Sequence, residues 1–135
     1  VHVQILKAGE RSKSFKTLQD IHQNLALLKF DRTDCIIAIG GGVIGDISGF
    51  AASTYLRGID FIQIPTTLLA MVDSSVGGKT AINIPQGKNL VGAFYNPKKV
   101  FISITYLQTL NEKEYKSGLG EVVKYAFILN KKLFI

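Results

Sequence analysis

An apolar run of strand length leads directly into a glycine-rich turn, and this junction constrains the fold more than any other part of the chain. Cys35–Ile39 is unbroken and apolar, and Gly40, Gly42 and Gly45 follow it at the spacing of a dinucleotide-binding fingerprint, ahead of a predicted helix. Glycines allow a pyrophosphate to lie against backbone N–H groups, and a helix N-terminus favours its negative charge. A tight turn that needs positive φ would carry the same glycines, so the pattern alone leaves both interpretations open.

The acidic residues near this turn argue against an ordinary Rossmann dehydrogenase. Such enzymes carry an acid about twenty residues after the glycines, at the end of the second strand. Asp60 has this spacing, but it precedes the strand predicted at Phe61–Ile64 and so belongs to the opposite edge of the sheet. Asp46, directly after the third glycine, is the distinctive acid, and it either serves a ligand or neutralises the helix N-terminus.

Strands and helices alternate along the first two thirds of the chain. Further strands are predicted over residues 3–6 and 100–104, and Cys35–Ile39 is expected to be buried on both faces. Ser14 is a predicted N-cap for a helix with one apolar face, and a second helix is predicted over residues 47–55. The apolar face of the first helix consists of Phe15, Leu18, Ile21, Leu25 and Leu28. This alternation predicts an α/β fold, a Rossmann-like parallel sheet flanked by helices.

The pattern becomes wholly helical after residue 110. Val122, Tyr125, Ala126 and Leu129 fall on one stripe. We therefore expect residues 1–110 to form a nucleotide-binding α/β domain and residues 111–135 to begin a helical domain. Both ends look cut, because a strand begins at once and the last helix stops at apolar residues that need a packing partner. We expect a first strand and the remainder of the helical domain to be missing.

Composition and charge exclude several classes of protein. Lys and Arg outnumber Asp and Glu by 16 to 10, but they are scattered, with short clusters at residues 98–99 and 131–132, so we expect no nucleic-acid partner. No segment approaches the length of a membrane span, so we expect no membrane contact, and the first residues do not resemble an export signal. The single cysteine, Cys35, is expected to be a buried, inert thiol, which fits a cytoplasmic protein.

The segment Asp73–Thr80 ends in Gly-Lys-Thr and superficially resembles a P-loop. Asp73 stands where that motif needs its first glycine, and the preceding residues 68–72 are helix-like instead of a buried strand, so ATP or GTP hydrolysis is rejected. The polar stretch 73–97 has no clear period and is interpreted as a functional loop. It holds lysines suited to phosphate, and a carboxylate and an amide suited to hydroxyls, as a phosphorylated polyol requires. These residues are Asp73, Lys79, Lys88 and Asn89.

Glu121 and Lys124 are three residues apart and so share one helix face. Most such pairs are surface ion pairs of small energetic effect. Here the surrounding segment Gly118–Lys124 is apolar and glycine-rich, which indicates a buried, functional carboxylate. His2 and His22 each stand alone near the N-terminal end, without a partner at metal spacing, and are interpreted as structural or exposed.

Six blocks in order resemble the signature blocks of the 3-dehydroquinate synthases. They are residues 40–46, 55–58, 64–70, 72–80, 87–89 and 120–124, and the resemblance extends from about Gly9 to Phe127. It implies an NAD- and metal-dependent enzyme of the shikimate pathway, the route to aromatic amino acids. Such an enzyme converts 3-deoxy-D-arabino-heptulosonate 7-phosphate to 3-dehydroquinate and phosphate. The family's route is transient oxidation by NAD, phosphate elimination, re-reduction and intramolecular aldol closure.

The resemblance also implies a role for each matching residue. NAD contacts are implied for Glu10, Lys13, Gly41, Gly42, Asp46, Thr66, Thr67 and Thr109, with Lys88 between cofactor and substrate. Substrate contacts are implied for Asp73, Lys79, Asn89 and Lys124, and for Arg57 across the interface of a homodimer. Glu121 is implied as one ligand of a divalent metal, zinc or cobalt, that acts as a Lewis acid. The family's two other ligands are histidines of a C-terminal domain, which His2 and His22 do not match, and one carboxylate is not a zinc site.

Three alternatives stay open. Another sugar-phosphate cyclase, such as 2-deoxy-scyllo-inosose synthase, would share the fold, the cofactor and most of the blocks. A metal-dependent polyol dehydrogenase of the glycerol dehydrogenase type would share the fold, but residues 73–80 and 87–89 argue against it. Finally, we expect the isolated 135-residue chain to be a folding or binding fragment without catalysis of its own. We do not expect the complete gene product to lack catalysis.

Overall fold

A parallel sheet forms the base of the molecule in the computed structural model, which describes residues 1–128. Its strands are β1 (Cys35–Gly40), β2 (Asp60–Pro65) and β5 (Lys99–Val100), in the order β1-β2-β5. The register of β1 and β2 runs from Cys35 opposite Asp60 to Gly40 opposite Pro65. The parallel sheet is therefore confirmed, and Asp60 lies at the strand end remote from the glycine turn, as predicted.

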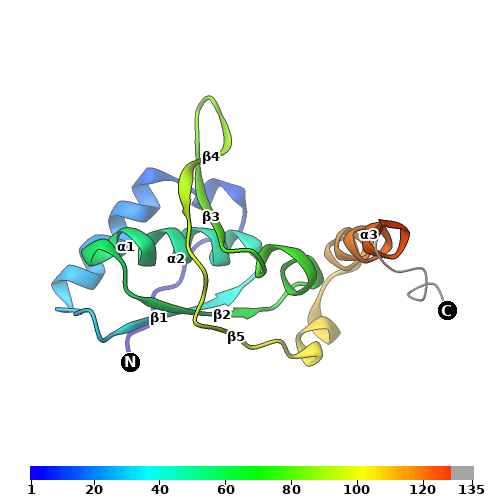
Figure 1. Ribbon diagram of the computed structural model, residues 1–135, viewed down its shortest axis with the longest axis horizontal. Helices are drawn as coiled ribbons and strands as arrows, with labels where there is room; N and C mark the ends of the chain where they lie inside the picture. Colours follow the sequence, from blue (N-terminus) through cyan, green and yellow to red (C-terminus); the bar gives the residue numbers. More distant parts are fainter. Residues whose placement is uncertain (129–135) are drawn as a thin grey trace.

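Helix α2 (Gly42–Thr54) is the centre of the core. It lies between the sheet on one side and, on the other, helix α1 (Phe15–Leu27) and a β-hairpin (Figure 1). Ile47 and Ala51 are fully buried, and a Cβ on Gly49 would collide with Phe61 of the sheet and with Thr80 of the hairpin. The small residues of this helix therefore allow both layers to approach it closely.

Helix α1 closes the opposite side of this core, and its predicted cap is confirmed. The Ser14 hydroxyl accepts a hydrogen bond from the Thr17 backbone N–H at 3.2 Å. Leu18, Ile21 and Leu25 are buried, as the helical spacing requires.

The predicted burial of β1 on both faces is wrong for this chain. Ile37 and Ile39 are more than half exposed, whereas Ala38 between them is buried. Successive strand residues point to opposite faces, and α2 covers one face of the sheet (Figure 1). Cys35 is correspondingly half-buried, and this burial raises the pKa of its thiol.

Two other strand predictions need correction, because a strand is defined by its pairing with a neighbour. Residues 3–6 form no strand: β1 is an edge strand, and it pairs with β2. The strand predicted over residues 100–104 is reduced to Lys99–Val100, and a 3-10 helix, η4 (Ile104–Thr109), follows it.

The polar stretch interpreted as a loop instead contains an antiparallel hairpin, β3 (Lys79–Ile84) and β4 (Gly87–Phe94). It projects beyond the helices and packs its base on α2 (Figure 1). A Cβ on Gly92 would overlap the carbonyl of Thr80, so the close pairing depends on glycine there. The helix-like character of the preceding residues is confirmed by η3 (Ala70–Ser74), a turn of π-helix.

Helix α3 (Glu112–Ile128) confirms the helical pattern after residue 110. It stands at one end of the molecule (Figure 1), and Gly118 brings it against Leu68. Ala126 of the predicted stripe is buried, whereas Leu129 lies outside the described residues. None of the helices formed by residues 1–128 is both long and apolar enough to cross a membrane. The remaining elements are the short 3-10 helices η1 (Glu10–Ser12) and η2 (Tyr55–Arg57).

Candidate active site

The glycine turn lies where the carboxyl ends of β1 and β2 meet. The backbone N–H of Thr66 donates to the Gly40 carbonyl at 2.9 Å, which brings the segment after β2 beside the turn. A Cβ on Gly41 would press on Thr67, and one on Gly42 would press on the Ser74 hydroxyl. The glycines therefore let Thr67 and Ser74 pack closely against the start of α2, and the N-terminus of a helix can bind an anion such as a pyrophosphate.

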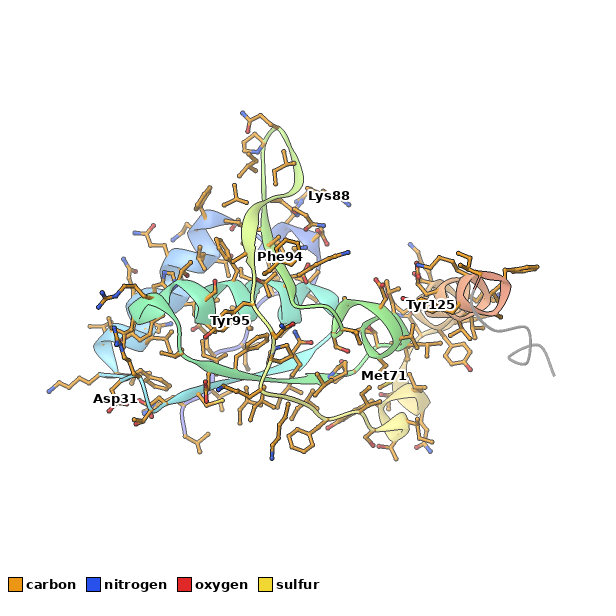
Figure 2. The ribbon with its side chains drawn as sticks, in the orientation of Figure 1. Asp31, Met71, Lys88, Phe94, Tyr95 and Tyr125 are labelled. Atoms are coloured by element: carbon orange, nitrogen blue, oxygen red, sulfur yellow. The ribbon has the colours of Figure 1, made fainter. Side chains whose placement is uncertain are left out.

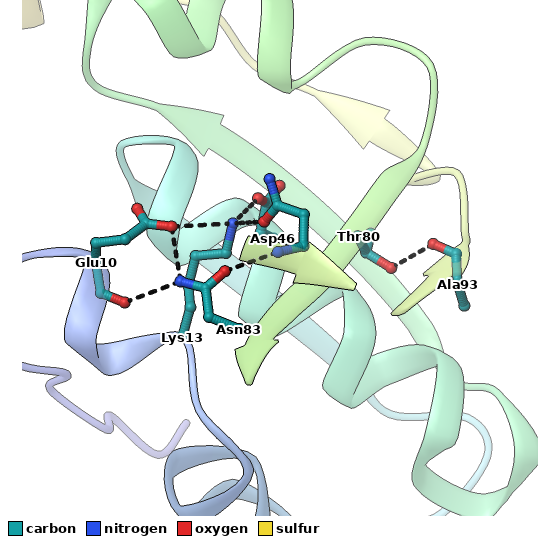
Figure 3. Close-up of polar contacts among 7 residues, drawn as sticks. Glu10, Lys13, Asp46, Thr80, Asn83 and Ala93 are labelled. Atoms are coloured by element: carbon teal, nitrogen blue, oxygen red, sulfur yellow. Dashed lines mark hydrogen bonds and ion pairs between the residues drawn. The ribbon is translucent and has the colours of Figure 1, made fainter. Parts of the chain in front are cut away.

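A buried lysine connects three segments beside this turn. The Lys13 side chain is 3% exposed, and its Nζ donates to Asp46 Oδ2 and to Asn89 Oδ1, each at 2.5 Å. Glu10 Oε1 lies 3.6 Å from the same ammonium (Figure 3). A buried ammonium is stable only when it is paired and hydrogen-bonded, and these oxygens meet that requirement. Four residues assigned to ligands by resemblance thus converge on one point.

Sequence reasoning missed Asn83, which holds this cluster together. Its Nδ2 donates to Glu10 Oε1 at 2.9 Å, and its Oδ1 accepts from the backbone N–H of Asn89 at the same distance (Figure 3). Its own N–H donates to the Lys13 carbonyl at 2.8 Å. Asparagine is disfavoured inside strands. Once residues 79–84 are recognised as a strand, the asparagine within it is the sequence signal that could have indicated a special role.

The pKa values of the two carboxyl groups in the cluster are shifted in opposite directions. Burial raises the pKa of Asp46, and the hydrogen bond and charge of Lys13 oppose this shift. The hydrogen bond from Asn83 lowers the pKa of Glu10 against the opposing effect of burial, and the positive charges of Lys13 and Lys88 lower it further. The cluster therefore combines one stabilised carboxylate with one whose charge depends on Lys13.

A cleft of about 490 Å³ opens between α2, η3 and the hairpin. Asp46, Asp73, Lys79 and Asn89 line it together with Ser74, whose hydroxyl is buried. Its rim is apolar, with Phe94 and neighbouring side chains of the hairpin. Figure 2 shows Lys88 on the same hairpin as Phe94, and Lys88 is exposed. The cleft thus offers both charge signs and an amide group to a polar ligand, but Lys88, which was predicted to join Asp73, Lys79 and Asn89, is not among its lining residues.

Glu121 and Lys124 form the ion pair that their spacing predicts. Glu121 is 26% exposed, with Oε2 shielded from solvent, and Lys124 lies over the Tyr125 ring at 4.9 Å. The hydrogen bond to Glu121 raises the pKa of Lys124. No group of three or more His, Cys, Asp or Glu side chains within residues 1–128 is arranged to hold a metal ion. Zinc needs at least three protein donors, so these residues do not fit a metal by themselves.

Not every residue assigned by resemblance lines the cleft, and Lys88, Lys124, Arg57 and Thr109 are among those that do not. Arg57 is exposed beyond the far end of α2 from Asp46. The Thr109 hydroxyl, on exposed η4, donates to the Tyr106 carbonyl at 3.2 Å. His22 contacts the Thr54 hydroxyl at 2.9 Å, which confirms its structural interpretation, and His2 is exposed as predicted.

The fold and the site define a Rossmann-like α/β domain with a charged cleft beside the glycine turn that follows its first strand. Residues 3–117 match the family model described as 3-dehydroquinate synthase N-terminal. The chain belongs to this family.

Relatives and solved structures agree with this assignment. The 3-dehydroquinate synthase of Clostridium acetobutylicum is 57% identical over 130 residues, which is 96% of this chain and 36% of that protein. A 2-deoxy-scyllo-inosose synthase solved with carbaglucose-6-phosphate, NAD+ and Co2+ superposes with a TM-score of 0.91 at 38% identity, over 95% of this chain and 35% of that one. The 2-epi-5-epi-valiolone synthase of Streptomyces hygroscopicus, solved with NAD+ and Zn2+, superposes with a TM-score of 0.94 at 33% identity. This match covers 98% of this chain and 37% of that one. The chain thus spans about a third of the length of its curated relatives.

Proposed function

We propose that the complete protein is a 3-dehydroquinate synthase, which converts 3-deoxy-D-arabino-heptulosonate 7-phosphate to 3-dehydroquinate and phosphate. Family membership over residues 3–117 carries this proposal. The charged cleft supports it independently, because a phosphorylated sugar acid needs cations for its phosphate and carboxylate, and hydrogen-bonding groups for its hydroxyls. The chain by itself is inactive in this proposal, since it spans about a third of its relatives.

The glycine turn is the proposed binding site of NAD, which supplies the hydride acceptor for a transient oxidation and returns the hydride later. Gly41 and Gly42 let the pyrophosphate approach the α2 N-terminus, with Thr66 and Thr67 beside it. Carboxylate oxygens accept hydrogen bonds from ribose hydroxyls, which is the role proposed for Glu10 and Asp46. Lys13 holds these two carboxylates in place. Thr109 is proposed as a further cofactor contact.

The substrate is proposed to occupy the cleft next to the turn. Lys79 and Lys88 face anionic groups, and Asp73 and Asn89 hydrogen-bond to hydroxyls. Lys124 reaches the substrate from α3, and Arg57 reaches its phosphate in the partner of a homodimer, since it lies away from its own chain's cleft. Cations that surround a leaving phosphate stabilise the negative charge that develops on it.

Glu121 is proposed as one donor to a divalent cation, zinc or cobalt, in the complete protein. A carboxylate oxygen is an ordinary ligand of zinc and of other divalent cations, and the Glu121 side chain is largely buried beside Lys124. The other donors come from outside residues 1–128 in this proposal. We further propose a cytoplasmic enzyme, consistent with its single cysteine.

Phosphate release from the two candidate substrates separates the main proposal from its nearest alternative. The complete protein with NAD is expected to release phosphate from the heptulosonate phosphate and to leave glucose 6-phosphate unchanged. Turnover of glucose 6-phosphate alone would move the assignment to a 2-deoxy-scyllo-inosose synthase, whose solved structure is 38% identical to this chain. The 57% identity to a 3-dehydroquinate synthase favours the first outcome.

A further inference from the structure

Asn83 occupies an irregular point of the hairpin that frees it from ordinary strand pairing. Ile82 pairs with Val91, but Ile84 pairs with Gly87, so the register shifts between Ile82 and Ile84. The Asn83 N–H then donates to Lys13, in the segment that follows η1, instead of to β4. Such irregularities redirect side chains and are frequent beside active sites.

Both ends of the Asn83 amide are used by residues from different segments. The NH₂ group donates to Glu10 Oε1, and the carbonyl oxygen accepts from the Asn89 N–H, each at 2.9 Å. Asn89 has a φ of 57°, in the left-handed region, and this backbone contact helps to hold it there. Glu10 and Asn89 are two of the three side chains that surround the Lys13 ammonium.

We propose that Asn83 is a positioning residue that fixes Glu10 and Asn89 relative to each other, and so aligns the cofactor side of the site with its substrate side. The inference rests on the proposed function for the identity of the two ligands. It concerns a residue that touches neither ligand in our assignment and acts through the two residues that do. The Asn83 amide can position both residues because its NH₂ group donates to Glu10 while its oxygen accepts from Asn89.

Only asparagine satisfies both contacts at this length. Aspartate would keep an acceptor for the Asn89 N–H, but it would lose the donor to Glu10 and would place a second carboxylate against the first. Leucine has nearly the same shape and can make neither contact. The two substitutions therefore separate the cofactor side from the substrate side, and a residue with a merely structural role would show no such separation.

The test uses the complete protein and measures the dissociation constant of NAD and the KM for the heptulosonate phosphate. For Asn83→Asp we expect the NAD dissociation constant to rise about tenfold, with a nearly unchanged KM, since the loss of a buried hydrogen bond has this size. For Asn83→Leu we expect both quantities to rise about tenfold, because both contacts are lost. Ile21→Val, at a buried α1 residue that makes none of the hydrogen bonds of the cluster, is the control for lost stability, and it should change neither quantity.

The possible outcomes separate this inference from the proposed function. Wild-type protein that binds NAD but does not turn over the heptulosonate phosphate would overturn the proposed function. Active wild-type protein with unchanged constants in both Asn83 variants would overturn the positioning role. The role would also be overturned if Asn83→Asp, like Asn83→Leu, raised the NAD dissociation constant and the KM by the same factor. If Asn83→Leu fails to fold, Asn83→Asp still decides the point, because its expected effect is confined to NAD.

Discussion

Lys13 and Glu121 are charged side chains of the same candidate site, but their partners differ in origin. The Lys13 side chain is 3% exposed, and its ammonium contacts oxygens from η1, α2 and β4. Glu121 is 26% exposed, and its partner Lys124 lies one turn further along the same helix. The first arrangement exists only when three separate segments are folded together, whereas the second follows from helix geometry alone.

This difference indicates which half of the site the present chain completes. Around Lys13 the residues proposed for NAD already satisfy one another, so the cofactor side is preorganised before a ligand binds. At Glu121 no second and third metal donor gathers within the described chain. We therefore expect substitutions around Lys13 to act through the fold, and substitutions at Glu121 to act through a group that the rest of the protein completes.

The largest expected effect is loss of metal from Glu121→Gln. The complete protein should hold about one zinc per subunit, and the variant should lose most of it, because a neutral amide is a much weaker donor than a carboxylate. Elemental analysis after gel filtration measures this directly. Glu112→Gln is the matched control, since Glu112 lies on the same helix in an exposed ion pair with Lys116 at 2.6 Å.

The 135-residue chain alone provides the third sample, and it should hold no stoichiometric zinc. Full zinc occupancy in this chain would show that residues 1–135 contain a complete metal site. The Glu121 side of the site would then be as complete within this chain as the Lys13 cluster. Undiminished zinc in Glu121→Gln would remove Glu121 from the metal site.

The next effect is on substrate use and comes from Lys79→Ala in the complete protein. Lys79 lines the cleft but is not a partner of Lys13, so NAD affinity should stay nearly constant. Loss of a charge-assisted contact to phosphate should lower kcat/KM about 100-fold. Lys98→Ala is the control, because Lys98 pairs with Asp60 at the opposite end of β2. An equal loss of NAD affinity and turnover would mean that Lys79 contacts the cofactor instead.

Local patterns were sufficient to predict the strand, the glycine turn and the following helix, which contributes Asp46 to the cleft lining. Each depends on residues close in sequence, as does the Ser14 cap. The hairpin was missed because glycines and polar residues obscure the period of two in residues 79–94, and because its pairing is stabilised by packing on α2. Burial of β1 was overestimated because an apolar run shows only that both faces of a strand could be buried. Within the described residues, one face of β1, with Ile37 and Ile39, stays exposed.

The Lys13 cluster marks the limit of inference from residues alone. Lys13 and Asn89 are 76 positions apart, and no spacing or period connects them. The family resemblance assigned both to ligands, but it did not indicate that they contact each other or that Asn83 joins them. Contacts between distant segments follow from the folded topology, so their geometry became visible only in the structure.

A moderate effect on stability is expected from a pair of glycine substitutions. Gly92→Ala in the hairpin should destabilise the protein by about 2 kcal/mol, since the added Cβ overlaps backbone atoms that have no room to move. Gly120→Ala on α3 meets nothing within 4 Å and should be neutral or stabilise the helix by up to about 1 kcal/mol. Urea unfolding of both variants measures the contrast. Equal effects would show that α3 is as tightly packed as the cleft wall.

The smallest effect concerns the acid side of the stability profile and tests the Lys13 cluster through Glu10. The pKa of Glu10 is lowered in the folded state, chiefly by the Asn83 hydrogen bond, from an ordinary value of 4.5. A carboxyl group with a lowered pKa contributes stability above its unfolded value and loses it as the pH falls through the folded value. Glu10→Gln should therefore destabilise the protein near pH 7, and its difference from wild type should shrink as the pH falls below 4.5 toward about pH 3. Because the side chain is 40% exposed, the difference should be a few tenths of a kcal/mol. Urea midpoints at the two pH values measure it, and in an Asn83→Leu background the pH-dependent part should shrink, since its main cause has been removed. A difference that stays constant between pH 7 and pH 3 would mean that the Glu10 carboxylate gains nothing from Asn83, and that this cluster is no more dependent on its surroundings than the ion pair on α3.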